Sequence, residues 1–299
     1  MKIKKVKKSK VIASFIIGIL LMFSIVLSAI SLFTKFVVLN PEKYINILEE
    51  KQIYTKMYEF LDGNLGYALI VKNIDADVKD DIISEEELKI EVNSFVRNLM
   101  NFLTTGINNI GEFNVDKYSS RLDENLNNYI RENSIFINNN IENEINILKD
   151  EINQVIKSEL EIINTDIIVN SSTGIILSKI IKLFVNGFYL IPVIMVGVLI
   201  VILNFIWKKD MIRFMQWTGN GTIAAGLFLF LVFFSGYISG FYNNVSIYTI
   251  YLRDFVSSLI KNWMLILWLY GMVIIVLGTL MLIPLIKSYI KRSKMTKKA

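Results

Sequence analysis

The residues best suited to chemistry are the carboxylates of one short acidic segment, residues 75–86. Asp75 and Asp77 stand at alternate positions, Asp81 follows them, and Glu86 is the twelfth residue counted from Asp75. Carboxylates at these spacings can converge on one Ca²⁺ ion, as they do in calcium-binding loops between two helices. The pattern predicts a weak calcium site.

Two residues inside this segment oppose calcium binding. Lys79 stands where a calcium loop needs an oxygen ligand, and Asp80 stands where glycine makes the sharp turn. We therefore expect a solvated acidic loop that leads into a helix. Stabilisation of that loop by calcium is a hypothesis.

The adjacent triplet Glu85-Glu86-Glu87 offers carboxylates for acid–base catalysis. Three consecutive residues at a helix start point in different directions around the helix axis, and the positive end of the helix attracts all three. Ser84 and Glu87 also form a capping box, in which each side chain accepts a free backbone N–H of the other residue. We expect these residues to begin a helix and to have no catalytic role.

Histidine and cysteine are both absent from the 299 residues. Their absence excludes zinc sites made of His and Cys, cysteine nucleophiles and Ser-His-Asp triads. No other catalytic set stands out in the sequence. We expect a protein that is not an enzyme and that has no cofactor.

The composition of the chain and four long apolar stretches indicate a membrane protein. The chain is 53% hydrophobic with a mean hydropathy of +0.48, which is too apolar for a soluble domain. Four stretches without Asp, Glu, Lys or Arg are long enough to cross a hydrocarbon layer of about 30 Å. They predict transmembrane helices over residues 11–33, 183–207, 219–241 and 263–286.

The first span also resembles a secretory signal peptide, because six lysines in residues 1–10 precede the apolar run. Its 23 uncharged residues exceed the apolar core of a cleaved signal, which has about 7 to 15. No small-x-small cleavage site follows. We expect an uncleaved anchor.

The distribution of charge predicts the orientation. The short segments 1–10, 208–218 and 287–299 are basic, whereas residues 34–182 hold 25 of the 27 acidic residues. Basic segments next to spans face the cytoplasm. We expect both termini and residues 208–218 on the inner side of a cytoplasmic membrane, and residues 34–182 and 242–262 on its outer side. We expect no binding of nucleic acid.

The outer segment 34–182 has helical patterns throughout. Asn40-Pro41 begins a helix that we expect Gly63 and Gly66 to end, and Ser84 begins one that Gly106 and Gly111 end. Further helices are expected over residues 115–131 and 135–163. The fold class is an all-α integral membrane protein with four transmembrane helices and a helical-bundle extracytoplasmic domain between spans 1 and 2.

The last of these helices has a seam of apolar residues at steps of four and three. Such a seam packs against another helix, either within the bundle or in a coiled-coil dimer, and we favour the bundle. The seam consists of Ile141, Ile145, Leu148, Ile152 and Val155.

Small residues four positions apart mark close helix contacts inside the membrane. They pack spans within one chain or, as the alternative, build a homo-oligomer. The pairs are Ser14/Gly18, Ser24/Ser28, Gly221/Ala225 and Gly236/Gly240.

The outer segment 242–262 is rich in tyrosine and contains Arg253 and Lys261. Aromatic and basic side chains suit the surface of a bilayer, so we expect an outer interfacial loop there, and the composition also suits an interfacial helix.

The chain resembles uncharacterised four-span bacterial envelope membrane proteins. The resemblance is carried by Asn40-Pro41-Glu42-x-Tyr44, by Ser84-Glu85-Glu86, and by Trp207-Lys208-Lys209 followed by Gly219, Gly221 and Gly226. It implies no activity. The layout is also similar to the cell-division ABC-permease family, with Lys208-Lys209-Asp210-Met211-Ile212 as the charged approach to the third span.

Two functions follow as expectations. The first is a non-enzymatic membrane protein whose outer domain binds or senses an unknown envelope protein or ligand. The alternative is a permease-like subunit coupled to a separate ATPase, which contacts Lys208, Lys209 and Arg213.

Overall fold

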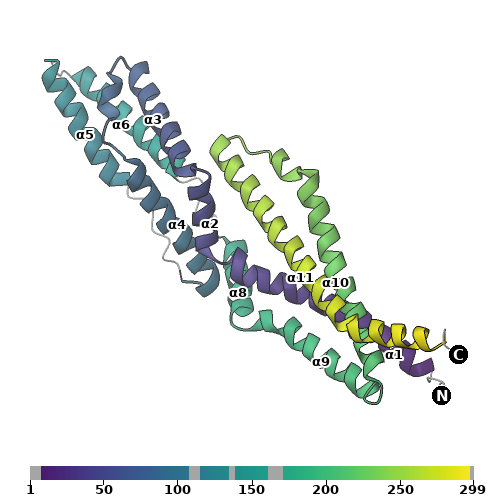
Figure 1. The fold of residues 1–299 in the computed structure, drawn as a ribbon. Helices are drawn as coiled ribbons and strands as arrows, with labels where there is room; N and C mark the ends of the chain where they lie inside the picture. The colour runs from purple at the N-terminus through teal and green to yellow at the C-terminus, as the bar shows by residue number, and fades with distance from the viewer. Residues whose placement is uncertain (1–7, 108–114, 135–138, 161–170, 297–299) are drawn as a thin grey trace. The chain divides into compact units, whose positions relative to one another are not determined.

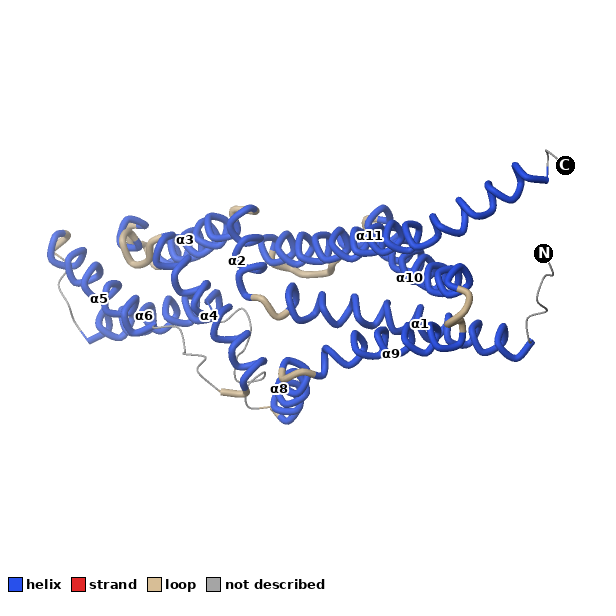
Figure 2. The backbone as a smooth tube through the Cα atoms, turned by 60° about the horizontal axis from the view of Figure 1, so that its bottom comes forward, coloured by secondary structure: helices blue, strands red, loops and turns tan. Residues whose placement is uncertain are grey.

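The computed structural model of the protein describes residues 8–107, 115–134, 139–160 and 171–296. All regular structure in these ranges is helical, and they contain no strand (Figures 1 and 2). The expected all-α class is confirmed for this part of the chain. Two compact units are present: a span unit of residues 1–40, 183–246 and 256–299, and a helical domain of residues 41–182 and 247–255.

Four helices among the described residues are long and apolar enough to cross a membrane, as a multi-pass membrane protein requires. The expected number of spans is therefore confirmed. The helices cover Lys8–Val38, Phe188–Ile206, Met211–Ser239 and Ile250–Lys287.

Helix α1 (Lys8–Phe33) continues into the π-helix η1 (Thr34–Val38). It packs along α9 (Ile191–Ile206) and α10 (Met211–Ser239) (Figure 1). Because a bilayer core offers no water, hydroxyl groups there need partners within the protein. The buried Ser28 hydroxyl meets this need by donating to the Ser24 carbonyl at 2.7 Å.

A bend separates α9 from the helix before it. α8 (Ser172–Val185) runs across the expected start of the second span, and Gly187 follows with a φ of 133°. This backbone conformation favours glycine. The 3-10 helix η3 (Phe188–Leu190) then leads into α9, and Pro192 lies in its first turn, where a missing N–H costs nothing.

The third and fourth spans form a helical hairpin (Figure 2). α10 ends at Gly240, whose left-handed φ of 65° closes the helix, and the 3-10 helix η4 (Phe241–Asn244) follows. α11 (Ile250–Thr296) then runs for 47 residues with Pro284 inside it. A separate interfacial helix in residues 242–262 is thus not found, because residues from Ile250 onward already belong to α11.

In the helical domain, α2 (Pro41–Glu50) begins at the expected proline. The expected single helix is divided in two by Gln52, which has a left-handed φ of 51°. α3 (Ile53–Val71) follows and passes through Gly63 and Gly66.

The expectation that these two glycines end a helix is wrong. A β-carbon on Gly66 would lie 3.2 Å from Cε of Lys79, so glycine here makes room for a neighbouring side chain. Lys79 lies in the 3-10 helix η2 (Ala76–Lys79).

α4 (Glu85–Thr105) begins with the expected capping box. The Glu87 N–H donates to Oγ of Ser84 at 3.2 Å, and the Ser84 N–H donates to the Glu87 carboxylate at 3.3 Å. The helix ends at Gly106, whose φ of 76° is the left-handed conformation that stops a helix. Gly111 lies outside the described residues.

α5 (Val115–Glu132) and α6 (Asn139–Leu160) correspond to the last two expected helices, although the expected ends at residues 135 and 163 lie outside the described ranges. α6 packs on α3 and α5 and buries Leu148, Ile152 and Ile156. Leu148 and Ile152 of the expected seam are thus covered by helices of the same chain, and Val155 packs against the same core, as the bundle interpretation expects. The side chain of Ile141 lies outside the described residues.

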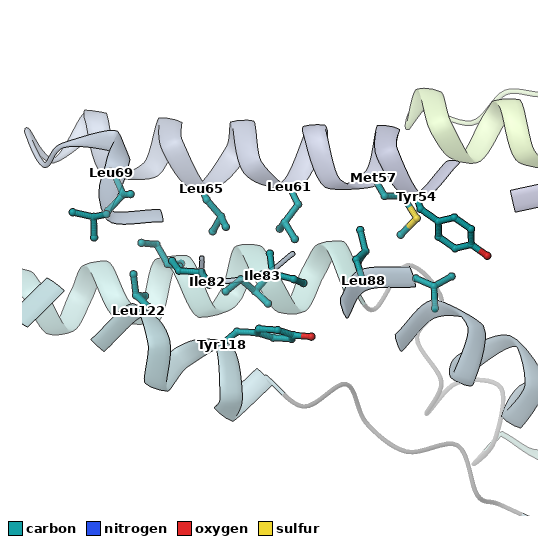
Figure 3. Packing of buried hydrophobic residues seen from close by; sticks show 14 of the residues in the cluster. Tyr54, Met57, Leu61, Leu65, Leu69, Ile82, Ile83, Leu88, Tyr118 and Leu122 are labelled. Atoms are coloured by element: carbon teal, nitrogen blue, oxygen red, sulfur yellow. The ribbon is translucent and has the colours of Figure 1, made fainter. Parts of the chain in front are cut away.

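The core of the helical domain lies between α3, α5 and the loop that holds η2. Leucines at every fourth position of α3 point toward Ile82, Ile83 and Leu122 (Figure 3). These leucines are Leu61, Leu65 and Leu69.

A segment from far along the sequence completes this core. Tyr251, at the start of α11, is 4% exposed and belongs to the same cluster. Its ring lies 5.8 Å from the ring of Phe60, and Asp254 pairs with Lys56 at 2.7 Å. The helical domain is therefore not the single block 34–182, because residues 247–255 are part of it.

Candidate functional site

The four carboxylates of the calcium pattern have separate roles. Asp75 accepts the Asp77 N–H at 3.2 Å and so caps η2. Asp81 has a left-handed φ of 59°, and Glu86 lies exposed in the first turn of α4. No group of three or more acidic residues placed to hold a metal ion occurs in the part of the chain that the structure describes. The pattern is not assembled into a calcium site.

Basic and amide side chains organise the acidic loop instead. Lys79 pairs with Asp62 of α3 at 2.7 Å. The amide of Asn125, on α5, donates to the carbonyls of Val78 and Asp80 at 2.9 and 2.8 Å. These hydrogen bonds hold the backbone of the loop on α5.

Glu87 joins three elements of the domain. The two terminal nitrogens of Arg121 donate to its two carboxylate oxygens at 2.7 and 2.8 Å, and Lys117 donates to it as well. Arg121 also donates to the carbonyl of Ile82 at 3.0 Å. These paired hydrogen bonds hold α5 against the start of α4, and they are the strong, charge-assisted kind.

The same contacts determine the charge of Glu87. The hydrogen bonds from Arg121 lower its pKa to about 2 against the opposing effect of burial, and Lys117 and the Ser84 N–H add smaller contributions that also lower it. Glu87 therefore stays ionised and cannot supply a proton near neutral pH. Its neighbour Glu85 accepts a hydrogen bond from the hydroxyl of Thr55 at 2.6 Å, so the acidic triplet fastens helices together.

Buried tyrosines of the domain are equally unsuited to acid–base chemistry. Burial raises the pKa of Tyr54 and of Tyr118 to about 12. Tyr54 donates to the side-chain oxygen of Asn93 at 2.6 Å, and Tyr118 of α5 is fully buried in the core cluster of the domain. Both stay neutral and serve as core residues.

A cavity of about 190 Å³ lies at one end of the helical domain. It opens between the end of α3 and the facing sides of α5 and α6. Apolar side chains form most of its wall, and Lys72, Tyr129 and Glu144 place polar groups at it. The remaining lining residues are Asn73, Ile74, Leu126, Ile130, Ile145 and Leu148.

Exposed apolar side chains occur at the end of α3, close in sequence to the lining residue Lys72. Tyr67, Ile70 and Val71 occupy the last two turns of α3, directly before the lining residue Lys72, and are 71%, 60% and 56% exposed. We call these three residues the α3 patch. Sequence reasoning missed both the cavity and the patch, because apolar residues on every side of α3 give no sign of which side is left uncovered.

In the span unit, the basic turn between α9 and α10 holds the expected partner residues Lys208, Lys209 and Arg213. Lys208 and Lys209 are exposed. Arg213 pairs with Asp210 at 3.2 Å and lies 5.3 Å from the ring centre of Trp207. Arg213 is therefore held by Asp210 and Trp207, and the two lysines are the basic residues of the turn that are exposed to a partner.

Trp207 ties this turn to the start of α1. Its indole is 5% exposed, and Nε1 donates to the hydroxyl of Ser14 at 2.8 Å. Lys10 lies 5.9 Å from the ring centre and donates to the carbonyl of Ile206 at 2.9 Å. Lys10 and Arg213 thus both approach one aromatic ring, where a cation is attracted to the π electrons.

The expected small-residue contacts are placed as follows. A β-carbon on Gly221 would lie 3.1 Å from the carbonyl oxygen of Gly18, so α1 and α10 approach closely there. Ala225 is fully buried on the same helix, while Gly236 lies against the side chain of Met264. Gly240 instead terminates α10.

Among the glycines of the described spans, the closest backbone approach joins α10 and α11. Glycines seven residues apart on each helix face those on the other, and a β-carbon on any of them would come within 2.7 Å of a neighbouring atom. A spacing of two turns returns to the same face, so this signal is present in the sequence, but a search for four-residue spacing overlooks it. The four residues are Gly219, Gly226, Gly271 and Gly278.

No protein-family model, no curated protein and no solved structure matches the chain.

Proposed function

We propose that the protein is a non-enzymatic, multi-pass protein of a bacterial cytoplasmic membrane, and that its helical domain lies outside and binds an envelope partner. The observation that carries this proposal is the cavity between α3, α5 and α6, and the exposed α3 patch at the end of α3 adds to it. A concave, mostly apolar site and exposed apolar side chains on one domain are what a binding surface needs.

The packing within each unit supports the topology. Residues 41–182 and 247–255 are both outside in the topology that charge predicts, and they share one core. Lys10 and the basic turn are both inside in that topology, and they meet at Trp207. In both cases, segments that pack together are assigned to the same side of the membrane.

The size of the cavity indicates the kind of ligand. Sites for drug-sized molecules and cofactors have volumes of roughly 300 to 1,000 Å³. A cavity of about 190 Å³ suits one large side chain, of the kind that anchors a protein–protein interface. The partner is therefore a polypeptide that inserts an apolar side chain beside Tyr129 and spreads over the α3 patch.

Site-specific photo-crosslinking in intact cells tests this proposal on the full chain. A photoreactive amino acid at Ile70 should capture a discrete partner band, whereas the same residue at Ile90 of α4 should not. The two isoleucines are matched, because each is 60% exposed on a helix of the domain. Equal labelling from both positions, or none from Ile70, would contradict the proposal.

A second variant separates binding from folding. Ile130→Trp should fill the cavity with a larger apolar side chain and abolish the crosslink from Ile70, while the melting temperature stays near that of the parent chain. A crosslink that survives a filled cavity would show that the cavity is not where the partner binds.

The alternative function is a permease-like subunit coupled to a separate ATPase. The specific observation in its favour is the exposure of Lys208 and Lys209 in a turn that Asp210, Trp207 and Arg213 make rigid. An ATPase that copurifies with the parent chain and is lost from Lys208→Glu, Lys209→Glu, with an unchanged melting temperature, would support this alternative. Unaltered copurification would oppose contact at this turn.

A further inference from the structure

Helix α8 carries apolar side chains that are left uncovered. Ile176, Ile180 and Leu183 recur at steps of four and three, so they share one face, and their exposed fractions are 56%, 58% and 56%. Gly174 and Ser178 lie on another face of the helix and are buried. One side of the helix is therefore packed against the protein, and the apolar side chains of another side are exposed.

The charges of α8 are all of one sign. Lys179 and Lys182 are exposed, and no acidic residue occurs between Ser172 and Val185. In the rest of the helical domain, by contrast, acidic side chains outnumber basic ones. An apolar face bordered by lysines along one side is the pattern of a helix that lies in the plane of a membrane surface and contacts anionic headgroups.

The chain itself keeps the end of α8 near the bilayer. The span helix that contains α9 begins at Phe188, three residues after α8 ends at Val185. An extended chain advances at most ~3.6 Å per residue, and the turn that the Gly187 N–H closes on the carbonyl of Phe184 makes this connection shorter still. Val185 therefore lies within about 10 Å of the start of a span.

One aromatic side chain of α8 belongs to a group of aromatic rings at the start of the second span. Phe184, on its last turn, lies 6.1 Å from the ring of Tyr189, which also meets Phe36 at 6.4 Å and the ammonium of Lys35 at 5.8 Å. Aromatic and basic side chains gather at the boundary between hydrocarbon and headgroups. Their position marks the membrane surface at the end of α8, independently of the apolar face.

We propose that α8 is an interfacial helix whose apolar face of Ile176, Ile180 and Leu183 rests in the acyl chains of the adjacent leaflet, with Lys179 and Lys182 on anionic headgroups. Gly187 supplies the bend that turns the chain from this helix into the second span. The lipid is the occupant of the bare face because the connection holds the helix at the membrane, where hydrocarbon is the nearest apolar phase.

Spin-label accessibility on the full chain in lipid vesicles tests this proposal. The chain has no cysteine, so single substitutions at Ile176, Ile180 or Leu183 introduce the only thiol. Collision of the label with lipid-soluble oxygen should exceed collision with a water-soluble nickel complex several-fold at these sites. Ile90→Cys is the matched control, because Ile90 is 60% exposed on a helix that is not joined to a span, and its ratio should be reversed.

The contribution of the lysines is measured in the same way. In vesicles that contain phosphatidylglycerol, Lys179→Glu, Lys182→Glu should shift the label at residue 180 toward water, and in pure phosphatidylcholine the shift should be much smaller. Lack of any dependence on phosphatidylglycerol would overturn the headgroup contact. Accessibility to the nickel complex equal to that at residue 90, or burial from both reagents, would overturn the lipid contact itself.

Discussion

Gly226 and Gly271 lie against each other where α10 and α11 cross, and neither position has room for a side chain. A β-carbon on Gly226 would lie 2.7 Å from the backbone nitrogen of Ile275, and one on Gly271 would lie 2.6 Å from that of Phe230. Backbones that approach so closely gain dispersion contacts, which are a main source of helix association in a membrane.

The first prediction concerns this crossing. Gly226→Val should force α10 and α11 apart and lower the stability of the span unit by about 1 to 3 kcal/mol, the usual cost of overpacking. Thermal melting of the purified chain in detergent measures the loss. Gly197→Val of α9 is the control, because a β-carbon there would meet no atom within 4 Å. Similar melting of the two variants would contradict the role of the crossing.

The second prediction concerns the pH dependence that Glu87 creates. Its pKa of about 2 in the folded protein lies below the ordinary value of 4.5, so its ionised form favours the folded state. This stabilisation is complete above the ordinary pKa and is lost as the pH falls from about 5 toward 2. The melting temperature of the parent chain should fall through this range by more than that of Glu87→Gln.

Glutamine at residue 87 still fits a capping box, so this variant isolates the charge from the cap. At pH 7 it should cost about 1 to 2 kcal/mol, because a hydrogen-bonded carboxylate that is only partly screened is replaced by a neutral amide. Glu86→Gln, an exposed neighbour, is the matched control and should change little. An equal pH dependence in the parent chain and in Glu87→Gln would refute the assignment.

The third prediction concerns the anchoring of Trp207. Ser14→Ala removes the acceptor of a buried indole N–H, and leaving such a group without a partner costs about 1 to 3 kcal/mol. Ser235→Ala is the control, since that hydroxyl is exposed and bonds only within its own helix. Melting of the two variants should differ, and a stable Ser14→Ala chain would show that the bond contributes little.

The fourth prediction concerns calcium. Because Lys79 of the acidic loop pairs with Asp62 of α3, and Asn125 and Arg121 bind carbonyls of the loop, adding Ca²⁺ or removing it with a chelator should not shift the melting of the helical domain. A rise in melting temperature with Ca²⁺, abolished by Asp75→Asn, would restore the calcium hypothesis.

Features that depend on neighbouring residues in the sequence could be predicted. The capping box of Ser84 and Glu87 and the left-handed Gly106 are of this kind, since each satisfies backbone groups within one turn of helix. The span helices could also be predicted, because a long apolar stretch has few alternatives in water.

Features that depend on partners from elsewhere in the chain could not. Residue 66 of α3 is a glycine because the side chain of Lys79 lies where a β-carbon would be. Residue 271 is a glycine because Gly226 of another helix approaches it closely. The cavity depends on how far apart α3, α5 and α6 are held, which no periodicity records. In each case the decisive atoms come from residues that are distant in sequence.

The place of Tyr251 in the core has a consequence for biogenesis. A ribosome delivers residues 41–182 first, and it must then make the second and third spans before Tyr251 emerges. Until then, Phe60 and the neighbouring core lack the ring that covers them. The domain is therefore completed only once membrane insertion is well advanced, and a nascent chain stalled before residue 251 should be more open to protease and to chaperones than the finished one.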